Sequence, residues 1–334
     1  MDTPNPPGGT SPGAPATAPG RPAAPVTRPG DRIFAGLSRG SGIALLAVMA
    51  AIAVFLTVRS VTAISGDHGN FLTTFEWNTN LAVPRFGIAV LVYGTVVSSV
   101  IAMAIAVPVA IGIALFISHY APRRLAGPLA YLVDLLAAVP SIVYGLWGAL
   151  YLVPHLQGLN LWMDHYLGWT VVLRQSNSGT AARSLFTVGI LLAIMILPII
   201  TNVSREVFRQ VPRAHEEAAL ALGATRWEVV RTAVLPFARS GIISASMLGL
   251  GRALGETMAV ATVLSSSPVL SSHIVDPDGG TFAQNIAVHF GEATDFGRDA
   301  LIASGLVLFV ITLLVNGAAR LIIARRKEYS GASA

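Results

Sequence analysis

The sequence predicts an all-α, polytopic membrane protein with six transmembrane helices. Hydrophobic residues make up 53% of the 334 residues and charged residues only 12%, about half of the roughly 25% that is typical of soluble domains. Several uncharged stretches reach the length of about 20 apolar residues that an α-helix needs to cross a bilayer. A water-soluble enzyme does not fit this composition. The absence of cysteine also removes disulfides, thiolate metal sites and cysteine nucleophiles.

Six spans are expected in the order of the chain. The uncharged stretch between Arg85 and Arg123 is long enough for one helix with interfacial ends. The third span carries a single charge, Asp134, and should be kinked at Pro140, where one backbone hydrogen bond is lost. The resulting six-span domain covers residues 40–325, with spans at about 41–64, 87–118, 126–154, 185–204, 240–265 and 300–323.

The two ends of the chain are predicted to lie outside the bilayer. Residues 1–39 are rich in Pro, Gly and Ala and should form a disordered tail, because this composition buries too little apolar surface to fold. Residues 326–334 form a second, short tail. Cytoplasmic loops carry the excess of Arg and Lys, and most of the 22 basic residues lie in the two tails and in the loops after spans two and four. Both termini are therefore expected in the cytoplasm.

The last outer loop is predicted to be a solvated acidic surface. Its acidic residues do not have the spacing of an EF-hand calcium loop, so no bound ion is assigned to them. The residues concerned are Asp276, Asp278, Glu292, Asp295 and Asp299.

Three motifs, for nucleotide binding, metal binding and nucleophilic catalysis, are incomplete or misplaced in this sequence. The only lysine, Lys327, lies outside any G-x-x-x-x-G-K-[ST] sequence, so this chain cannot itself be a P-loop ATPase. His215 and Glu216 begin like a zinc-binding H-E-x-x-H helix, but Ala219 occupies the position of the second histidine. The G-x-S-x-G match at residues 36–40 precedes a membrane helix and lacks the strand that a nucleophile elbow requires. No metal site and no catalytic residue are expected.

The cytoplasmic loop at 205–239 is the most informative part of the sequence. Residues from Arg213 to Leu222 should form a short helix, because Ala, Leu and Glu favour helix and Gly223 is a suitable left-handed stop. A second helix should follow at once and form an elbow with the first. A generic surface turn is the alternative interpretation.

The second helix of this elbow has its own start and stop signals. Thr225 and Glu228 form a capping box, and Pro236 is expected to end the helix. The first helix would present a small apolar face flanked by acidic residues, which another protein could approach closely. The residues of this face are Glu216, Glu217, Ala218, Ala219 and Leu222.

The fifth predicted span contains two charged residues, Arg252 and Glu256. An arginine at mid-membrane costs at least about 2.5–3.5 kcal/mol, and the two residues are four positions apart, where they could pair on one helical face. Gly251 and Gly255 form a small-xxx-small pattern that suits tight helix packing. One interpretation is that the charged pair only pins two helices together. The other is that Arg252 offers donors to a tetrahedral oxyanion while Glu256 positions it.

The proline of the third span has two polar neighbours, Ser141 and Tyr144. With Pro140 they are further candidates for the pathway, because unpaired backbone groups at this depth are tolerated only against protein or water. Simple bending of the helix is the alternative.

The elbow resembles the EAA loop of the membrane permeases of bacterial ABC importers. The resemblance lies in Glu217-Ala218-Ala219, in Gly223 and in Leu235-Pro236, with Ala233 in place of the usual Ile. It implies the type I importer permease fold, in which this loop docks into a groove on a separate ATPase subunit. The implied coupling residues are Glu216, Glu217, Ala218, Ala219, Leu222 and Gly223.

Two further strings resemble the C-type permease of phosphate importers, namely R-A-L-G-E-T-M-A-V at 252–260 and D-L-L-A-A-V-P-S-I-V-Y-G-L-W-G at 134–148. The resemblance implies import of inorganic phosphate across a bacterial inner or cytoplasmic membrane, with Arg252 and Glu256 in translocation. It also implies an A-type sister permease, an ATPase dimer that uses ATP and Mg, an external phosphate-binding protein and membrane lipid. No cofactor on this chain and no nucleic acid are expected. A permease for sulfate or another oxyanion, a phosphate-status signalling scaffold and a membrane hydrolase are the alternatives.

Overall fold

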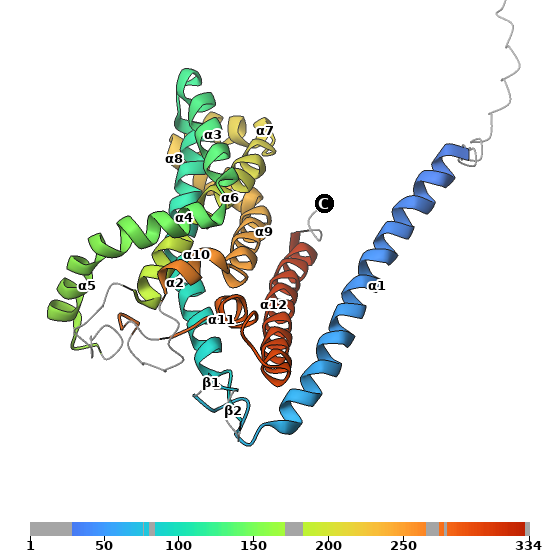
Figure 1. Cartoon of the computed structure of the whole chain (residues 1–334). Helices are drawn as coiled ribbons and strands as arrows, with labels where there is room; N and C mark the ends of the chain where they lie inside the picture. Colours follow the sequence, from blue (N-terminus) through green and yellow to red (C-terminus); the bar gives the residue numbers. More distant parts are fainter. Residues whose placement is uncertain are drawn as a thin grey trace, which may run out of the picture. The chain divides into compact units, whose positions relative to one another are not determined.

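The molecule is predominantly helical (Figure 1). The structure is a computed structural model that describes residues 29–75, 77–79, 84–170, 183–264, 274–276 and 279–330. Of the predicted tails at 1–39 and 326–334, the structure describes residues 29–39 and 326–330, which are helical; the rest, and Asp278 of the last outer loop, lie outside the described residues. The chain separates into two compact units, Met1–Ile52 and Ala53–Ala334, and each is considered by itself.

The described part of the first unit belongs to helix α1 (Pro29–Gly66). A proline as the first helical residue and an aspartate in the first turn, Asp31, both favour a helix start. The prediction of a disordered tail is therefore wrong for residues 29–39, which are helical. The overall composition of the segment, which is rich in Pro and Gly, predicts disorder and conceals these local start signals.

The second unit contains four further long helices and several short elements. Within the described residues, α1 and these four regions are long and apolar enough to cross a membrane. The long helices are α2 (Ala89–Leu115), α6 (Leu185–Arg209), α9 (Leu235–Leu254) and α12 (Asp295–Ser330). Within the described residues, the short elements are β1 (Trp77–Asn78), β2 (Arg85–Phe86), α3 (Arg123–Ala138), α4 (Ser141–Trp147), α5 (Val153–Leu167), α7 (Arg213–Ala221), α8 (Arg226–Val229), α10 (Met258–Val263), α11 (Phe282–His289) and the π-helical segments η1 (Phe116–Tyr120), η2 (Gly148–Leu152) and η4 (Val230–Val234).

The third predicted span is broken and not merely kinked. Helix α3 ends at Ala138, and the helical stretch Ser141–Leu167 continues at an angle of 91°. Val139 is extended, with φ −65° and ψ 129°, because the ring of Pro140 disfavours the α conformation in the residue before it. The described residues therefore hold five spans, or six if this bent pair is counted as one span.

The core of the second unit lies between α2, α6 and α9 (Figure 1). Helix α2 carries a row of small, fully buried residues at intervals of four, a spacing that places side chains on one face. On α6, Gly189 allows the same close approach, because a Cβ there would lie 2.5 Å from Cγ2 of Ile101. Small residues let membrane helices pack at short distance, so α6 is held centrally. The row on α2 consists of Ala102, Ala106, Ala110 and Ala114.

The short hairpin of β1 and β2 belongs to a second, aromatic core. The two strands are antiparallel, with Trp77 opposite Phe86. The fully buried Phe86 ring is in edge contact with the rings of Phe71, Trp77 and Phe296. This cluster joins the hairpin to the beginning of α12.

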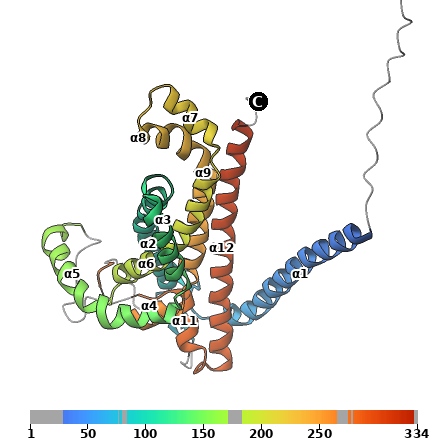
Figure 2. The ribbon, with the colours of Figure 1, turned by 90° about the horizontal axis from the view of Figure 1, so that it is seen from above.

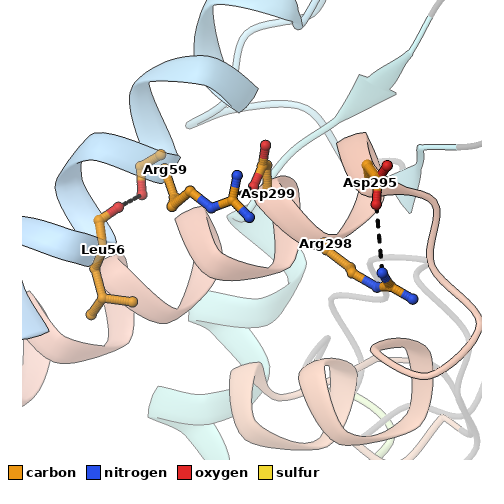
Figure 3. A network of polar contacts seen from close by, with 6 residues as sticks. Leu56, Arg59, Asp295, Arg298 and Asp299 are labelled. Atoms are coloured by element: carbon orange, nitrogen blue, oxygen red, sulfur yellow. Dashed lines mark hydrogen bonds and ion pairs between the residues drawn. The ribbon is translucent and has the colours of Figure 1, made fainter.

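Beside this cluster, Arg59 of α1 forms an ion pair with Asp299 of α12 (Figure 3). Arg59 Nε and Asp299 Oδ1 are 3.3 Å apart, without the alignment of a hydrogen bond, and the Asp299 side chain is only 10% exposed. Asp276 is also fully buried. The prediction of a solvated acidic surface is therefore wrong for Asp276 and Asp299, whereas Asp295, which pairs with Arg298, is exposed. Pairing with a distant arginine explains the burial of Asp299.

We expect Arg59→Gln to lower the thermal unfolding midpoint of the protein measured in detergent, because it leaves the buried Asp299 carboxylate unpaired. The expected cost is about 1–3 kcal/mol, since Arg59 itself remains half exposed. The matched control is Arg298→Gln, which removes an arginine from the exposed pair with Asp295. Equal midpoints for the two variants would contradict a structural role of the Arg59 pair.

Candidate functional site

The elbow after α6 has the local structure that its sequence predicts. Helix α7 ends at Ala221, and Gly223 adopts φ +84°, with its N–H donating to Leu220 O at 2.9 Å. A Cβ at Gly223 would contact nothing within 4 Å. Glycine is therefore needed here for its backbone conformation and not for space, because residues with a Cβ rarely adopt a positive φ.

The second helix of the elbow starts with the predicted capping box. Thr225 Oγ1 accepts a hydrogen bond from Glu228 N at 3.4 Å, and Glu228 Oε2 accepts one from Thr225 N at 2.7 Å. The predicted end of this helix is wrong, because the chain remains helical through η4 and Pro236 lies at the start of α9. Inside such a continuous run a proline removes one backbone hydrogen bond, but here it does not end the helix.

The outer surface of the elbow is open. None of the residues of α7 is buried, and Leu222 is 90% exposed. Figure 2 shows α7 and α8 lying beyond the ends of α6 and α9. Glu217 and Ala218 are exposed, whereas Glu216 and Ala219 are half-buried. Leu220 and Trp227 of the elbow are exposed as well, and a group of exposed apolar side chains is typical of a surface that another protein covers.

The base of the elbow is held by an apolar cluster and one polar contact. The cluster contains residues from the ends of α2 and α6, from η4 and from the start of α9, including Phe208 and Val234. His119 of η1 contacts Glu216 of α7, with His119 Nε2 and Glu216 Oε1 3.5 Å apart. The imidazole also lies edge-on to Phe208, and its buried Nδ1 has no hydrogen-bond partner. Nothing in the spacing of the sequence identifies His119, which is far from Glu216 along the chain.

Arg252 and Glu256 do not form the predicted ion pair. Helix α9 ends at Leu254, and Gly255 leaves helical geometry with φ −97° and ψ 4°. Glu256 is buried and accepts a hydrogen bond from Ala259 N at 3.3 Å, at the start of α10. Arg252 is exposed. Residues four positions apart lie on one face only of a continuous helix, and here the helix ends between Arg252 and Glu256.

Arg252 lines a cavity of ≈ 620 Å³ between α6, α9 and α12. Gly251 also lines it, and a Cβ added to Gly251 would have no neighbour within 4 Å. A Cβ added to Gly255 would have the Gly251 carbonyl oxygen as its nearest neighbour, at 3.6 Å. Neither glycine is therefore packed against another helix of the described chain, and their role in helix packing stays a prediction. The lining residues are Ile199, Ser244, Met247, Leu248, Gly251, Arg252, Asn316, Ala319 and Arg320.

The carbonyl of Leu136, just before the break at Pro140, has two hydrogen-bond donors. Val139 donates its N–H to Leu136 O at 3.4 Å, and Tyr144 donates its hydroxyl to the same oxygen at 2.8 Å. The Tyr144 side chain also lies within electrostatic range of Arg252. Ser141, half-buried, begins α4.

Helix α4 lies tightly against α10. A Cβ at Gly145 would lie 2.4 Å from Oγ1 of Thr262 and 2.8 Å from Cα of Ala259. This contact places the broken third span beside the segment that Glu256 caps. The described residues contain no group of three His, Asp or Glu side chains that could hold a metal ion.

Comparisons with known proteins agree with this architecture. A family model described as "Binding-protein-dependent transport system inner membrane component" matches residues 106–328. The "Phosphate transport system permease protein PstC 2" of Mycobacterium tuberculosis is 46% identical over 301 residues, which cover 88% of this chain and 92% of the relative. The "Phosphate transport system permease protein PstC" of Mesorhizobium japonicum is 40% identical over 308 residues, or 90% and 92% of the two chains.

Among solved structures, the fold is similar to a chain of a bacterial ABC transporter involved in the import of the acidic polysaccharide alginate. The TM-score is 0.52 at 16% identity, with 87% of this chain and 99% of the other covered. This similarity supports the all-α permease fold alone. The resemblance predicted from the EAA loop and from the string at 252–260 is confirmed. The chain belongs to the family of binding-protein-dependent transport system inner membrane components, and within it to the PstC-type permeases of ABC importers.

Proposed function

We propose that this chain is the membrane-spanning permease subunit of an ATP-driven importer that moves inorganic phosphate into the cytoplasm. The names of its relatives support phosphate as the substrate. The observation that carries the proposal is Arg252, which lines the ≈ 620 Å³ cavity without an acidic partner among the described residues. Its guanidinium offers up to five N–H donors in a planar fork, a geometry that suits phosphate oxygens.

The contact between Arg252 and phosphate is transient in this proposal. A pathway residue must bind its ion well enough for entry and weakly enough for release. An exposed arginine in a wide cavity meets this requirement better than a closed site with several buried donors. Glu256 has a positioning role, since it caps α10 beside Arg252. Tyr144 secures the broken helix at the same place.

The importer requires subunits that this chain does not contain. An A-type permease would lie beside it and form the other half of the pathway, with Gly251 and Gly255 available for packing. An ATPase dimer that uses ATP and Mg would bind the elbow, and an external phosphate-binding protein would deliver the ion. The permease itself is not an enzyme.

The orientation follows the positive charges of the loops. The six-span domain at 40–325 crosses a bacterial inner or cytoplasmic membrane with both termini in the cytoplasm, because the basic residues concentrate on that side. The elbow then projects into the cytoplasm, where an ATPase subunit can reach it.

The elbow transmits movement through its base. Closure of the ATPase pair displaces α7, and the contact between Glu216 and His119 passes this displacement to η1 and α2. The apolar cluster around Phe208 passes it to α6 and α9. Packed interfaces of this kind shift as units between two arrangements, so the cavity beside Arg252 can alternate between outward and inward access.

We expect Arg252→Gln to preserve assembly and to reduce phosphate accumulation strongly, measured as radiolabelled phosphate uptake in membrane vesicles. Loss of a charge-assisted contact worth about 1.5–3 kcal/mol lowers the uptake rate by about tenfold to a hundredfold. The control is Arg239→Gln, which removes an exposed arginine of α9 that does not line the cavity. Normal uptake by Arg252→Gln would reject the proposed pathway.

The elbow is tested with Leu222→Arg. A charged side chain in place of the exposed leucine should release the ATPase subunits, because the apolar contact is lost and a charge must be desolvated. Co-purification of the ATPase with the permease measures this. Leu72→Arg, at a leucine that is 65% exposed and lies before β1, should retain the ATPase. A complete complex with Leu222→Arg would rule out the elbow as the docking site.

The contact between His119 and Glu216 is tested by a double-mutant cycle with His119→Ala and Glu216→Ala. Each single change should lower the number of phosphate ions transported per ATP hydrolysed, and the double change should be no worse than the worse single one, since the two residues act through one contact. His119→Gln should restore part of the ratio, because its amide can donate to Glu216. Additive losses would show that the residues act independently.

A further inference from the structure

The cavity that exposes Arg252 contains a second arginine. Arg320 of α12 lines the same ≈ 620 Å³ space, together with Asn316 one turn earlier on that helix. Both side chains are exposed. Among the described residues, no aspartate or glutamate lines this cavity, and neither arginine is in an ion pair. Two positive charges therefore share one cavity without a negative charge to balance them.

This charge arrangement favours an anion. Unbalanced positive charge in a low-dielectric cleft concentrates anions there, and guanidinium groups bind phosphate oxygens through paired N–H donors. The amide of Asn316 adds two donors. Ser244 contributes no donor, since its hydroxyl already donates to Ser240 O at 3.0 Å. The cavity volume lies within the roughly 300–1,000 Å³ of small-ligand sites.

The two arginines lie at different places along the pathway. The α9 residues that line the cavity extend from Ser244 to Arg252, a length of about 12 Å along the helix. Arg320 lies in the last turn of the sixth predicted span, 300–323, shortly before the basic run Arg325-Arg326-Lys327. With both termini in the cytoplasm, Arg320 lies at the cytoplasmic end of that span. The cavity thus links Arg252 with the side on which the ion is released.

We propose that Arg320 and Asn316 form a second anion contact, which receives phosphate from Arg252 before its release into the cytoplasm. The proposal rests on the proposed function of Arg252 and adds an exit step to it. Arginines near helix ends also reach toward lipid headgroups. The shared chemistry is a phosphate group, and the experiments below separate an inorganic ion from a lipid.

The first experiment uses the absence of cysteine from the natural chain. Asn316→Cys introduces a single thiol into this chain, and its labelling is measured in the complete transporter with negatively and positively charged methanethiosulfonate reagents. The negative reagent should react about tenfold faster, as in a cleft of positive potential, and Arg320→Gln should remove most of this preference. Leu72→Cys, outside the cavity, calibrates the intrinsic reactivity of the two reagents. A preference that is unchanged by Arg320→Gln would overturn the proposal.

The second experiment identifies the ion. Inorganic phosphate should slow the labelling of Asn316→Cys in vesicles of purely zwitterionic lipid as much as in vesicles that contain phosphatidylglycerol, and Arg320→Gln should abolish this protection. Protection by phosphatidylglycerol alone would show that Arg320 binds a lipid headgroup, and the proposal would fail. Protection by sulfate in place of phosphate would leave the anion contact standing and reject phosphate as the substrate.

The third experiment measures transport. Arg320→Gln should lower the maximal rate of phosphate uptake by about five- to tenfold while ATPase subunits remain bound, and Arg320→Lys should recover part of the rate because it keeps the charge without the fork. Arg239→Gln is again the control. Full uptake by Arg320→Gln with full loss in Arg252→Gln would remove the exit step and leave the proposed function intact.

Discussion

A lipid bilayer offers no hydrogen-bond partner to the peptide backbone, and the break in the third span shows how this chain meets that constraint. Leu136 O, near the end of α3, accepts hydrogen bonds from Val139 N at 3.4 Å and from the Tyr144 hydroxyl at 2.8 Å. Pro140 itself has no N–H that would need a partner. Two donors therefore reach this carbonyl where the chain turns by 91°. Tyr144 is also within electrostatic range of Arg252, so the hydroxyl that binds Leu136 O belongs to a candidate residue of the pathway.

Local signals in the sequence predicted local structure well. The glycine stop at Gly223 and the capping box of Thr225 with Glu228 depend only on residues within one helical turn, and both are present. The end expected at Pro236 was wrong because a proline inside a continuous helical run can remove one backbone hydrogen bond without ending the helix. The pairing of Arg252 with Glu256 was wrong because it assumed that α9 continues past Gly255. The expectation that residues four positions apart can pair applies only where the helix continues between them.

Contacts between distant segments could not be predicted from one sequence. His119 meets Glu216 only because η1 lies beside α7, and Asp299 meets Arg59 only because α12 lies beside this part of α1. Neither pair has a spacing that a helix or a strand would impose. For the same reason the sequence does not single out Arg320. A basic residue at the end of the last span is also what the positive-inside pattern predicts. Only the structure shows that Arg320 lines the same cavity as Arg252, and this shared cavity is what indicates an anion contact.

The π-helical segment η4 has a geometric consequence for the elbow. A π-turn contains one residue more than an α-turn, and one residue corresponds to a rotation of about 100° around a helix axis. The extra residue between α8 and α9 therefore sets the azimuth at which the elbow leaves the bundle. Removing a single residue from η4 would turn the elbow to another side of α9, with every contact inside α7 intact. The direction in which the elbow projects is thus set by the phase of one helix, separately from the chemistry of the elbow surface.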